Sequence, residues 1–369
     1  MNKFPEIKKN FGFGCMRLPM KRGRIDIETF SKMTDAFIEA GFNYFDTAKG
    51  YMDGKSEGAL KKALTSRYPR DEFVLTDKLS TQCFKKESDI PALFEAQLRD
   101  CGVDYFDFYL MHAQDKSIYE KYTATHAYEW AARFKREGKV KHIGISFHDK
   151  ADVLDRILTE HPEIEVVQIQ FNYIDFDDPA VESGKCYEVC RKHSKPVIVM
   201  EPVKGGSLAK VPEKAAKLFA AAGDASPASY AIRFAAGFEG VEMVLSGMSD
   251  MAMMLDNISY MRDFRALDEK EREVVEKAKE IIKELHTIPC TACRYCTAHC
   301  PKKISIPDLF ACMNAKTAFH DWNSNYYYNL HTMSGGKAGD CIGCGACERI
   351  CPQHLEIRKL LKQVSKIFD

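Results

Sequence analysis

The sequence predicts an α/β chain in which a (β/α)8 TIM barrel is followed by a small, mainly α-helical domain. Three observations lead to this prediction. Eight short runs of strand-forming residues alternate with longer segments of helical periodicity in the first part of the chain. Polar side chains stand where several of these runs end, and nine of the 14 cysteines are confined to residues 290–351.

The eight predicted strands are nearly continuous in apolar residues, as in VVQIQF and VIVM. Such runs are typical of parallel strands that are buried on both faces. The predicted strands are Gly12–Leu18, Asn43–Thr47, Phe73–Leu79, Tyr105–His112, His142–His148, Val166–Tyr173, Pro196–Val203 and Val241–Met248.

Helical periodicity predicts helices between these strands. They include Glu28–Ala40, Ser56–Tyr68, Asp89–Cys101, Tyr119–Glu137 and Asp149–Glu160. A doubly wound sheet is the alternative, but it predicts a GxGxxG turn after an early strand. Gly12-Phe13-Gly14 does not continue into that pattern, so the barrel is favoured.

The concentration of cysteines after residue 289 predicts two domains, 1–286 and 287–369. Leu267–Leu285 has apolar residues at helical spacing and is predicted to be the helix that closes the first domain. In the second domain, helices are predicted at 306–319 and within 354–368.

Four polar residues stand at or beyond the ends of predicted strands: Asp46, Tyr51, Lys78 and His112. A Tyr hydroxyl has an ordinary pKa near 10, and a neighbouring ammonium such as Lys78 favours the phenolate and lowers this pKa. Asp46 would hold Lys78 charged and in place, while His112 donates a hydrogen bond to a substrate oxygen. Each residue alone has a structural explanation. Together at one barrel rim they indicate proton transfer to a carbonyl.

These four residues in this order, with the opening FGFGCMRLP and the GIS of the fifth strand, resemble the aldo-keto reductase family over about residues 10–285. The resemblance implies a barrel that binds a nicotinamide cofactor and transfers hydride between it and a carbonyl or an alcohol. It also implies that Tyr51 is the acid/base, tuned by Lys78 and Asp46, with His112 at the substrate oxygen.

The resemblance further implies a set of cofactor contacts. Ser146 and Gln168 match the positions that hold the carboxamide, and Met200 the position that stacks on the nicotinamide ring. The other implied contacts are Cys15 and Met16 in the opening motif, Pro202, Val203, Gly205 and Gly206 around the pyrophosphate, and Gly247, Met248 and Asn257 near the adenosine.

Three departures from the family pattern concern the cofactor. Phe147 replaces the usual Asn, Met200 replaces the usual aromatic residue, and Ser246–Tyr260 contains no Lys or Arg. Family members that prefer NADP use cations in that last segment, so the choice between NAD and NADP stays open. A helix N-terminus can also hold a phosphate without cations.

Two cysteine runs of the form CxxCxxCxxxCP provide eight candidate metal ligands. They are Cys290, Cys293, Cys296 and Cys300, then Cys341, Cys344, Cys347 and Cys351. This spacing is typical of bacterial [4Fe–4S] sites, in which the fourth Cys of each run binds the other cluster. Zinc is the alternative for paired CxxC sites. The identical runs favour two [4Fe–4S] clusters in a ferredoxin-like iron–sulfur domain, closer to the α-helical than to the β-rich type.

Composition and charge exclude some classes of binding partner. Lys plus Arg equals Asp plus Glu at 53 each, which argues against nucleic acid. No apolar run reaches the length of a membrane span and the N-terminal segment lacks a signal core, so a cytoplasmic location without membrane contact is expected. The expected partners are a small carbonyl or alcohol substrate and an external ferredoxin or flavodoxin.

Three functions remain open from the sequence. The first is an NAD(P)H-dependent carbonyl reductase whose clusters are structural or serve an electron partner. The second is a ferredoxin-linked or flavin-mediated reductase. No flavin motif is evident, although the phosphate-binding loops of a barrel can hold FMN. The third is an iron–sulfur scaffold or redox sensor without turnover.

Overall fold

The computed structural model describes residues 3–223, 225–284, 288–290 and 292–369, which form two compact units. We call the residues up to Asn172, with Gly184–Val203 and Ala228–Asp268, the barrel unit. Tyr173–Ser183, Lys204–Pro227 and Glu269–Asp369 form the cluster unit. The predicted domain boundary between residues 286 and 287 lies outside the described residues and stays a prediction.

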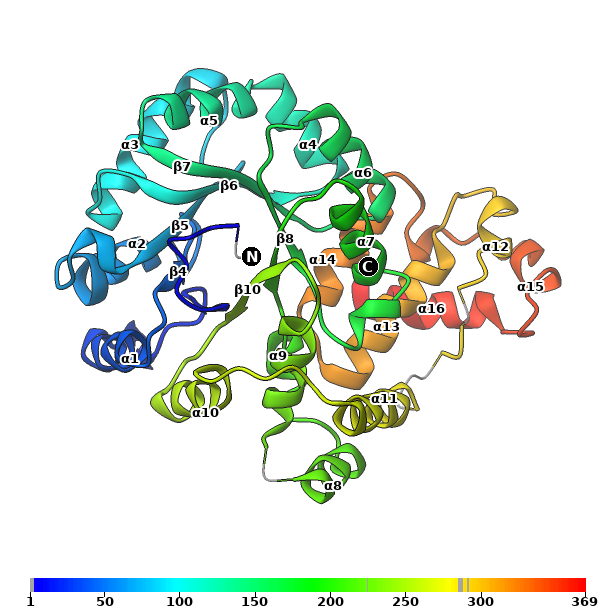
Figure 1. Ribbon diagram of the computed structural model, residues 1–369. Coiled ribbons are helices and arrows are strands. Elements are labelled where there is room, and N and C mark those ends of the chain that lie inside the picture. Colours follow the sequence, from blue (N-terminus) through cyan, green and yellow to red (C-terminus); the bar gives the residue numbers. More distant parts are fainter. Residues whose placement is uncertain (1–2, 224, 285–287, 291) are drawn as a thin grey trace. The chain divides into compact units, whose positions relative to one another are not determined.

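Eight parallel strands close into a barrel, which confirms the predicted fold (Figure 1). Their order around the barrel is β1-β10-β9-β8-β7-β6-β5-β4. The strands are β1 (Phe11–Gly14), β4 (Tyr44–Asp46), β5 (Val74–Leu79), β6 (Phe106–Gln114), β7 (Val140–Phe147), β8 (Val166–Gln170), β9 (Val197–Met200) and β10 (Val241–Ser246). A separate hairpin, β2 (Met20–Lys21) and β3 (Arg24–Ile25), was not predicted from the sequence.

Helices follow the strands in the barrel unit. They are α1 (Ile27–Glu39), α2 (Ser56–Leu60), α3 (Ile90–Cys101), α4 (Lys116–Ala124), α5 (Ala127–Arg136), α6 (Ala151–Glu160), α7 (Ser183–Lys192), α9 (Pro227–Ala236) and α10 (Met251–Met261). The predicted helix Ser56–Tyr68 is α2 continued by a π-helical segment, Lys61–Thr65. The predicted helix Tyr119–Glu137 is instead two helices, because His126 has a left-handed φ of 49° between α4 and α5.

Apolar side chains from six of the barrel strands fill the interior. Phe4 and Ile7, which precede β1, join this core. The Phe4 ring contacts Phe108 at 4.9 Å between centroids and His142 at 4.7 Å. The N-terminal segment therefore packs at the end of the barrel where the strands begin.

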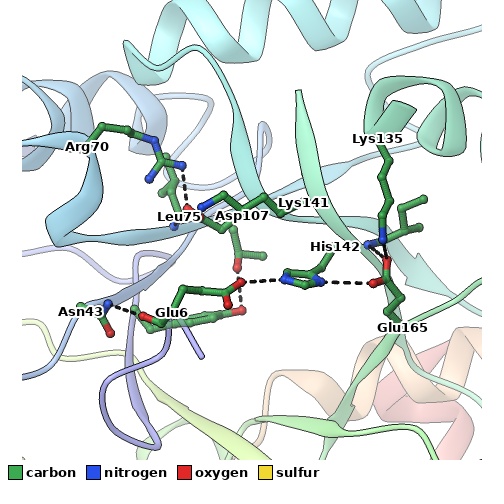
Figure 2. A network of polar contacts seen from close by, with 12 residues as sticks. Glu6, Asn43, Arg70, Leu75, Asp107, Lys135, Lys141, His142 and Glu165 are labelled. Carbon is green, nitrogen blue, oxygen red and sulfur yellow. Dashed lines mark hydrogen bonds and ion pairs between the residues drawn. The ribbon is translucent and has the colours of Figure 1, made fainter. Parts of the chain in front are cut away.

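Polar contacts tie the starts of the strands together at that end (Figure 2). His142 Nε2 lies 2.6 Å from Glu6 Oε1, and its Nδ1 lies 3.2 Å from Glu165 Oε2. Asp107 accepts hydrogen bonds from Arg70 at 2.6 Å and from Lys141 at 2.8 Å. These networks involve residues that precede or begin strands. They therefore lie at the end of the barrel opposite to the carboxyl ends of the strands.

The cluster unit is helical. It contains α8 (Glu213–Ala222), α11 (Glu269–Lys283), α12 (Tyr295–Ala298), α13 (Ile306–Phe319), α14 (Asn323–Thr332), α15 (Ala346–Arg349) and α16 (Ile357–Phe368). The helix predicted at 306–319 is α13, and the one predicted within 354–368 is α16. Leu285, the predicted end of the helix that is α11, lies outside the described residues.

The cluster unit has an apolar core of its own, formed mainly by α13, α14 and α16. A buried ion network lies in the same unit. Lys204 donates to Asp175 at 2.6 Å and lies 3.2 Å from Asp321, and all three side chains are at most 3% exposed. Asp175 and Lys204 belong to the segments that follow β8 and β9, so these two segments fold with the C-terminal region.

None of the helices in the described ranges is both long and apolar enough to span a bilayer.

Candidate active site and candidate metal centres

The ends of three neighbouring strands bring the four predicted residues together. Asp46 ends β4, Lys78 lies in β5 and His112 in β6, while Tyr51 follows β4 in a turn. Lys78 Nζ donates to Asp46 Oδ1 at 2.6 Å, to the Thr47 carbonyl oxygen at 2.8 Å and to the Tyr51 hydroxyl at 3.2 Å. The Tyr51 and His112 rings lie 5.7 Å apart between centroids. The structure thus assembles the predicted tetrad at the carboxyl ends of the strands.

Lys78 is a buried cation with no exposed surface, and its partner Asp46 is 4% exposed. Burial, the largest single influence, lowers the pKa of Lys78, but Asp46 and Tyr51 together outweigh burial, so the net pKa lies above its ordinary value. Lys78 is therefore charged at neutral pH. Its ammonium points at the oxygen of Tyr51.

The pKa of Tyr51 is shifted in the opposite direction to the one expected from Lys78 alone. Burial, the largest influence, raises the pKa of Tyr51, while the Lys78 charge lowers it and Asp46 raises it. The predicted effect of Lys78 is present, but the net pKa lies above the ordinary value. Tyr51 is therefore protonated at neutral pH, the state in which it can donate a proton.

His112 is a neutral imidazole in this site. Burial, followed by the charges of Lys78 and His148, lowers the pKa of His112 well below its ordinary value. Ser80 Oγ lies 2.7 Å from His112 Nδ1. If the Ser80 hydroxyl donates to Nδ1, the hydrogen of His112 is on Nε2. A neutral imidazole in that tautomer is a hydrogen-bond donor for a substrate oxygen.

Sequence reasoning missed the role of Ser80. Its position directly after LTDKL is the only local signal, because its partner His112 comes from the next strand. His148 also contributes, since burial and then the charge of Lys78 lower the pKa of His148 to about 4. His112 and His148 are therefore both uncharged imidazoles at neutral pH.

The residues predicted at the carboxamide lie directly beside each other, because Ser146 of β7 pairs with Gln168 of β8. Both are buried, and Gln168 Nε2 donates to Asp46 Oδ2 at 3.2 Å. Ser146 Oγ accepts from the Ala113 amide at 2.7 Å. These bonds leave the Ser146 hydroxyl hydrogen and Gln168 Oε1 as one donor and one acceptor. A carboxamide needs that pair, so these residues fit a nicotinamide.

The other predicted cofactor residues differ in exposure. Cys15 is buried, with its thiol 3.6 Å from the Phe13 carbonyl oxygen, whereas Met16 is 38% exposed. The Asn257 amide donates to Ser246 Oγ at 2.8 Å. The remaining ones are half-buried Met200 and Val203, buried Pro202 and Met248, and Gly205, Gly206 and Gly247, of which Gly205 and Gly247 are exposed.

Positive φ angles mark the segment predicted to surround the pyrophosphate. Lys204, Gly205 and Gly206 have φ of 47°, 65° and 102°. Lys204 is not available to a phosphate, because its ammonium is buried against Asp175 and Asp321. Any phosphate contact from these three residues must therefore come from their backbone N–H groups.

The cysteines gather around two hollows, each lined by residues of both runs. One hollow is lined by Cys290, Cys293, Cys296 and Cys351, and the other by Cys300, Cys341, Cys344 and Cys347. Each set offers four sulfur donors around one space, which fits a [4Fe–4S] cluster. The fourth Cys of each run lies at the other hollow, as the spacing predicts.

In their described residues, the two runs share left-handed backbone at equivalent positions, which lie 51 residues apart, as Cys290 and Cys341 do. Left-handed φ angles occur at Ala292 (53°) and Arg294 (63°), and again at Gly343 (72°) and Gly345 (71°). The short helices α12 and α15 follow at the same offset. The two runs therefore place their cysteines on equivalent turns.

Comparison with known proteins agrees with both parts. The model of the aldo/keto reductase family matches residues 10–280, more than half of the chain, and the model of a 4Fe-4S dicluster domain matches residues 289–356. An NADH-specific methylglyoxal reductase of Escherichia coli is 29% identical over 47% of this chain and 57% of its own length. An NAD(P)H-dependent D-xylose reductase of Scheffersomyces stipitis is 24% identical over 45% of this chain and 59% of its own length.

Solved structures support the barrel fold. An aldo-keto reductase from Klebsiella pneumoniae in complex with NADPH has a TM-score of 0.59 and 19% identity, covering 73% of this chain and 90% of its own. A holo-form aldo-keto reductase from Bacillus halodurans has a TM-score of 0.58 and 24% identity, covering 73% and 91%. With its barrel, its assembled tetrad and the match over residues 10–280, the chain belongs to the aldo/keto reductase family, here joined to a 4Fe-4S dicluster domain.

Proposed function

We propose that the barrel reduces a small carbonyl substrate, or oxidises the matching alcohol, with Tyr51 as the acid/base. The observation that carries this proposal is the buried Lys78 ammonium, which donates to both Asp46 and Tyr51. A nicotinamide cofactor, when bound, supplies the hydride. The chain's own residues then have to bind and orient the carbonyl and move one proton.

Each residue of the tetrad has a defined task in this proposal. The Tyr51 hydroxyl donates its proton to the carbonyl oxygen as negative charge develops there. Lys78 stabilises the resulting phenolate, and Asp46 keeps Lys78 charged and in place. His112 Nε2 orients the same oxygen by a hydrogen bond. Ser146 and Gln168 would hold the carboxamide beside Asp46, which favours one face of the cofactor.

The test is the Tyr51→Phe variant, assayed with NADH and with NADPH on methylglyoxal and xylose, the substrates named for the two relatives. Loss of the general acid should lower kcat/KM by about 10²–10⁴-fold with little change in cofactor affinity. Tyr68→Phe, which removes a half-buried hydroxyl bound to Asp35, is the matched control. Turnover of Tyr51→Phe close to wild type would exclude the proposed role.

We also propose that the eight cysteines hold two [4Fe–4S] clusters, with Cys300 and Cys351 exchanged between the runs. Anaerobically purified protein should then contain about eight iron atoms and eight acid-labile sulfides per chain, four of each for every cluster. Cys300→Ser should reduce both counts by about half, whereas Cys312→Ser, in the apolar core outside both runs, should not. Stoichiometric zinc without sulfide would contradict this assignment.

A second function, exchange of electrons with an external carrier, is favoured by the exposure of the cysteine sites. Cys293 at one hollow and Cys344 at the other are both exposed side chains. A ligand at the surface places the edge of a cluster within reach of another protein. A wholly structural cluster needs no such exposure.

A further inference from the structure

The rims of the two cysteine hollows differ in charge. Lys302 and Arg358 line the hollow of Cys300, Cys341, Cys344 and Cys347. Arg349 lies beside them, because its Nη1 donates to the Cys344 carbonyl oxygen at 3.3 Å. Lys302, Arg349 and Arg358 are all exposed.

Few carboxylates neutralise these cations. Arg358 forms an ion pair with Glu348 at 2.7 Å, while Lys302 and Arg349 have no carboxylate partner among the described residues. At the other hollow, Arg294 is the only Lys or Arg in the described lining, and it is paired with Asp308 through two hydrogen bonds of 3.0 and 2.8 Å. Among the described lining residues of the two hollows, an unpaired Lys or Arg therefore occurs only at the hollow completed by Cys300, where it is Lys302.

An exposed apolar side chain lines the same hollow as Lys302 and Arg358. Ile342 lies between ligands Cys341 and Cys344 in the sequence, lines the same hollow and is 62% exposed. An exposed apolar side chain together with cations suits a protein contact, in which the apolar side chain is buried and the charges steer the approach of the partner.

We propose that a small, acidic one-electron carrier protein docks on this surface, which we call the cationic rim: Lys302, Ile342, Arg349 and Arg358. The carrier and the cluster held by Cys300, Cys341, Cys344 and Cys347 exchange one electron. The reduced carrier is oxidised by one electron and the cluster is reduced by one, with no bond made or broken. This inference rests on the proposed clusters and assigns the external contact to one of them.

A simpler role for the cations is to balance the negative charge of the cluster itself. That role changes the reduction potential of the cluster, and so it alters reduction by every donor to a similar extent. Docking of an acidic protein instead changes the rate with that protein alone, and salt weakens it. The two roles are therefore separable by comparing a protein donor with a small uncharged donor.

The experiment is anaerobic stopped-flow reduction of the full-length protein by a photoreduced acidic bacterial ferredoxin, followed by bleaching of the cluster absorbance. Lys302→Glu combined with Arg349→Glu should slow the second-order rate about tenfold or more at low salt, and the wild-type rate should fall as salt rises. Ile342→Asp should also slow it. Photoreduced deazaflavin, a small donor, should reduce all variants equally.

Lys217→Glu is the matched control, because Lys217 is 76% exposed on α8 and lines neither hollow. A rim variant that reacts with ferredoxin at the rate of Lys217→Glu would overturn the docking proposal, as would equal slowing with deazaflavin. If deazaflavin reduces the clusters but ferredoxin does not, docking fails while the proposed clusters stand. Protein without iron and sulfide would overturn both.

Discussion

Lys78→Met tests whether the buried ion pair at the strand ends supports the barrel as well as the chemistry. The substitution keeps the length of the side chain but removes three hydrogen bonds, to Asp46, the Thr47 carbonyl and Tyr51. Asp46 is then left 4% exposed without its cation. Asp46 then keeps the hydrogen bond from the Gln168 amide at 3.2 Å.

The expected loss follows from the burial of both charges. Removing one partner of a buried pair costs about 3–5 kcal/mol, because the other charge stays desolvated. For a domain of this size, that loss lowers the Tm by about 6–20 °C. Asp46→Asn should be destabilised to a similar extent. The double variant should regain part of the loss, because a neutral amide facing a methionine leaves no buried charge.

The assay is thermal unfolding by circular dichroism under anaerobic conditions, with all variants at one scan rate. Lys32→Met is the control, since Lys32 forms an exposed pair with Glu28 and should change stability by less than about 0.5 kcal/mol. A Lys78→Met protein with the Tm of wild type, or a double variant whose losses simply add, would refute this reasoning.

Two other predictions concern ion networks outside the tetrad. Although burial alone would raise it, hydrogen bonds from His142, Lys135 and the Ile143 amide lower the pKa of Glu165 to about 2. Its contribution should therefore be present above the ordinary glutamate pKa of about 4.3 and be lost as the pH falls towards 2; acid unfolding of Glu165→Gln should show a smaller loss across this window than wild type. Lys204→Met should destabilise the cluster unit by about 3 kcal/mol, seen as earlier bleaching of the cluster absorbance in urea, whereas Lys214→Met, at a site 80% exposed, should match wild type.

The barrel could be predicted because each strand is a short apolar run and each run is followed by a helical pattern. Strand ends were less accurate. The first strand, predicted to reach Leu18, ends at Gly14, because pairing with β10 stops at Phe13 and pairing with β4 stops at Gly14. The break at His126 was also missed, since the apolar periodicity continues across a single residue of left-handed backbone.

The tetrad could be predicted because its residues stand at or shortly beyond the ends of strands, and parallel strands bring these ends together. Ser80 escaped prediction because its partner His112 comes from the neighbouring strand. The direction of the pKa shift of Tyr51 could not be predicted for another reason. Its sign depends on how completely the ring is buried, a quantity that the spacing of residues along the chain does not contain.

The buried Lys204 network has a consequence for engineering the chain. Asp175 and Lys204 lie in loops encoded within the barrel, yet they pair with each other and with Asp321 of the C-terminal region. A fragment ending at residue 284 would keep two of these three charges and lose the third. The C-terminal region is therefore not an independent domain that can be moved by itself. A chimera between relatives has to include Tyr173–Ser183 and Lys204–Pro227 along with it.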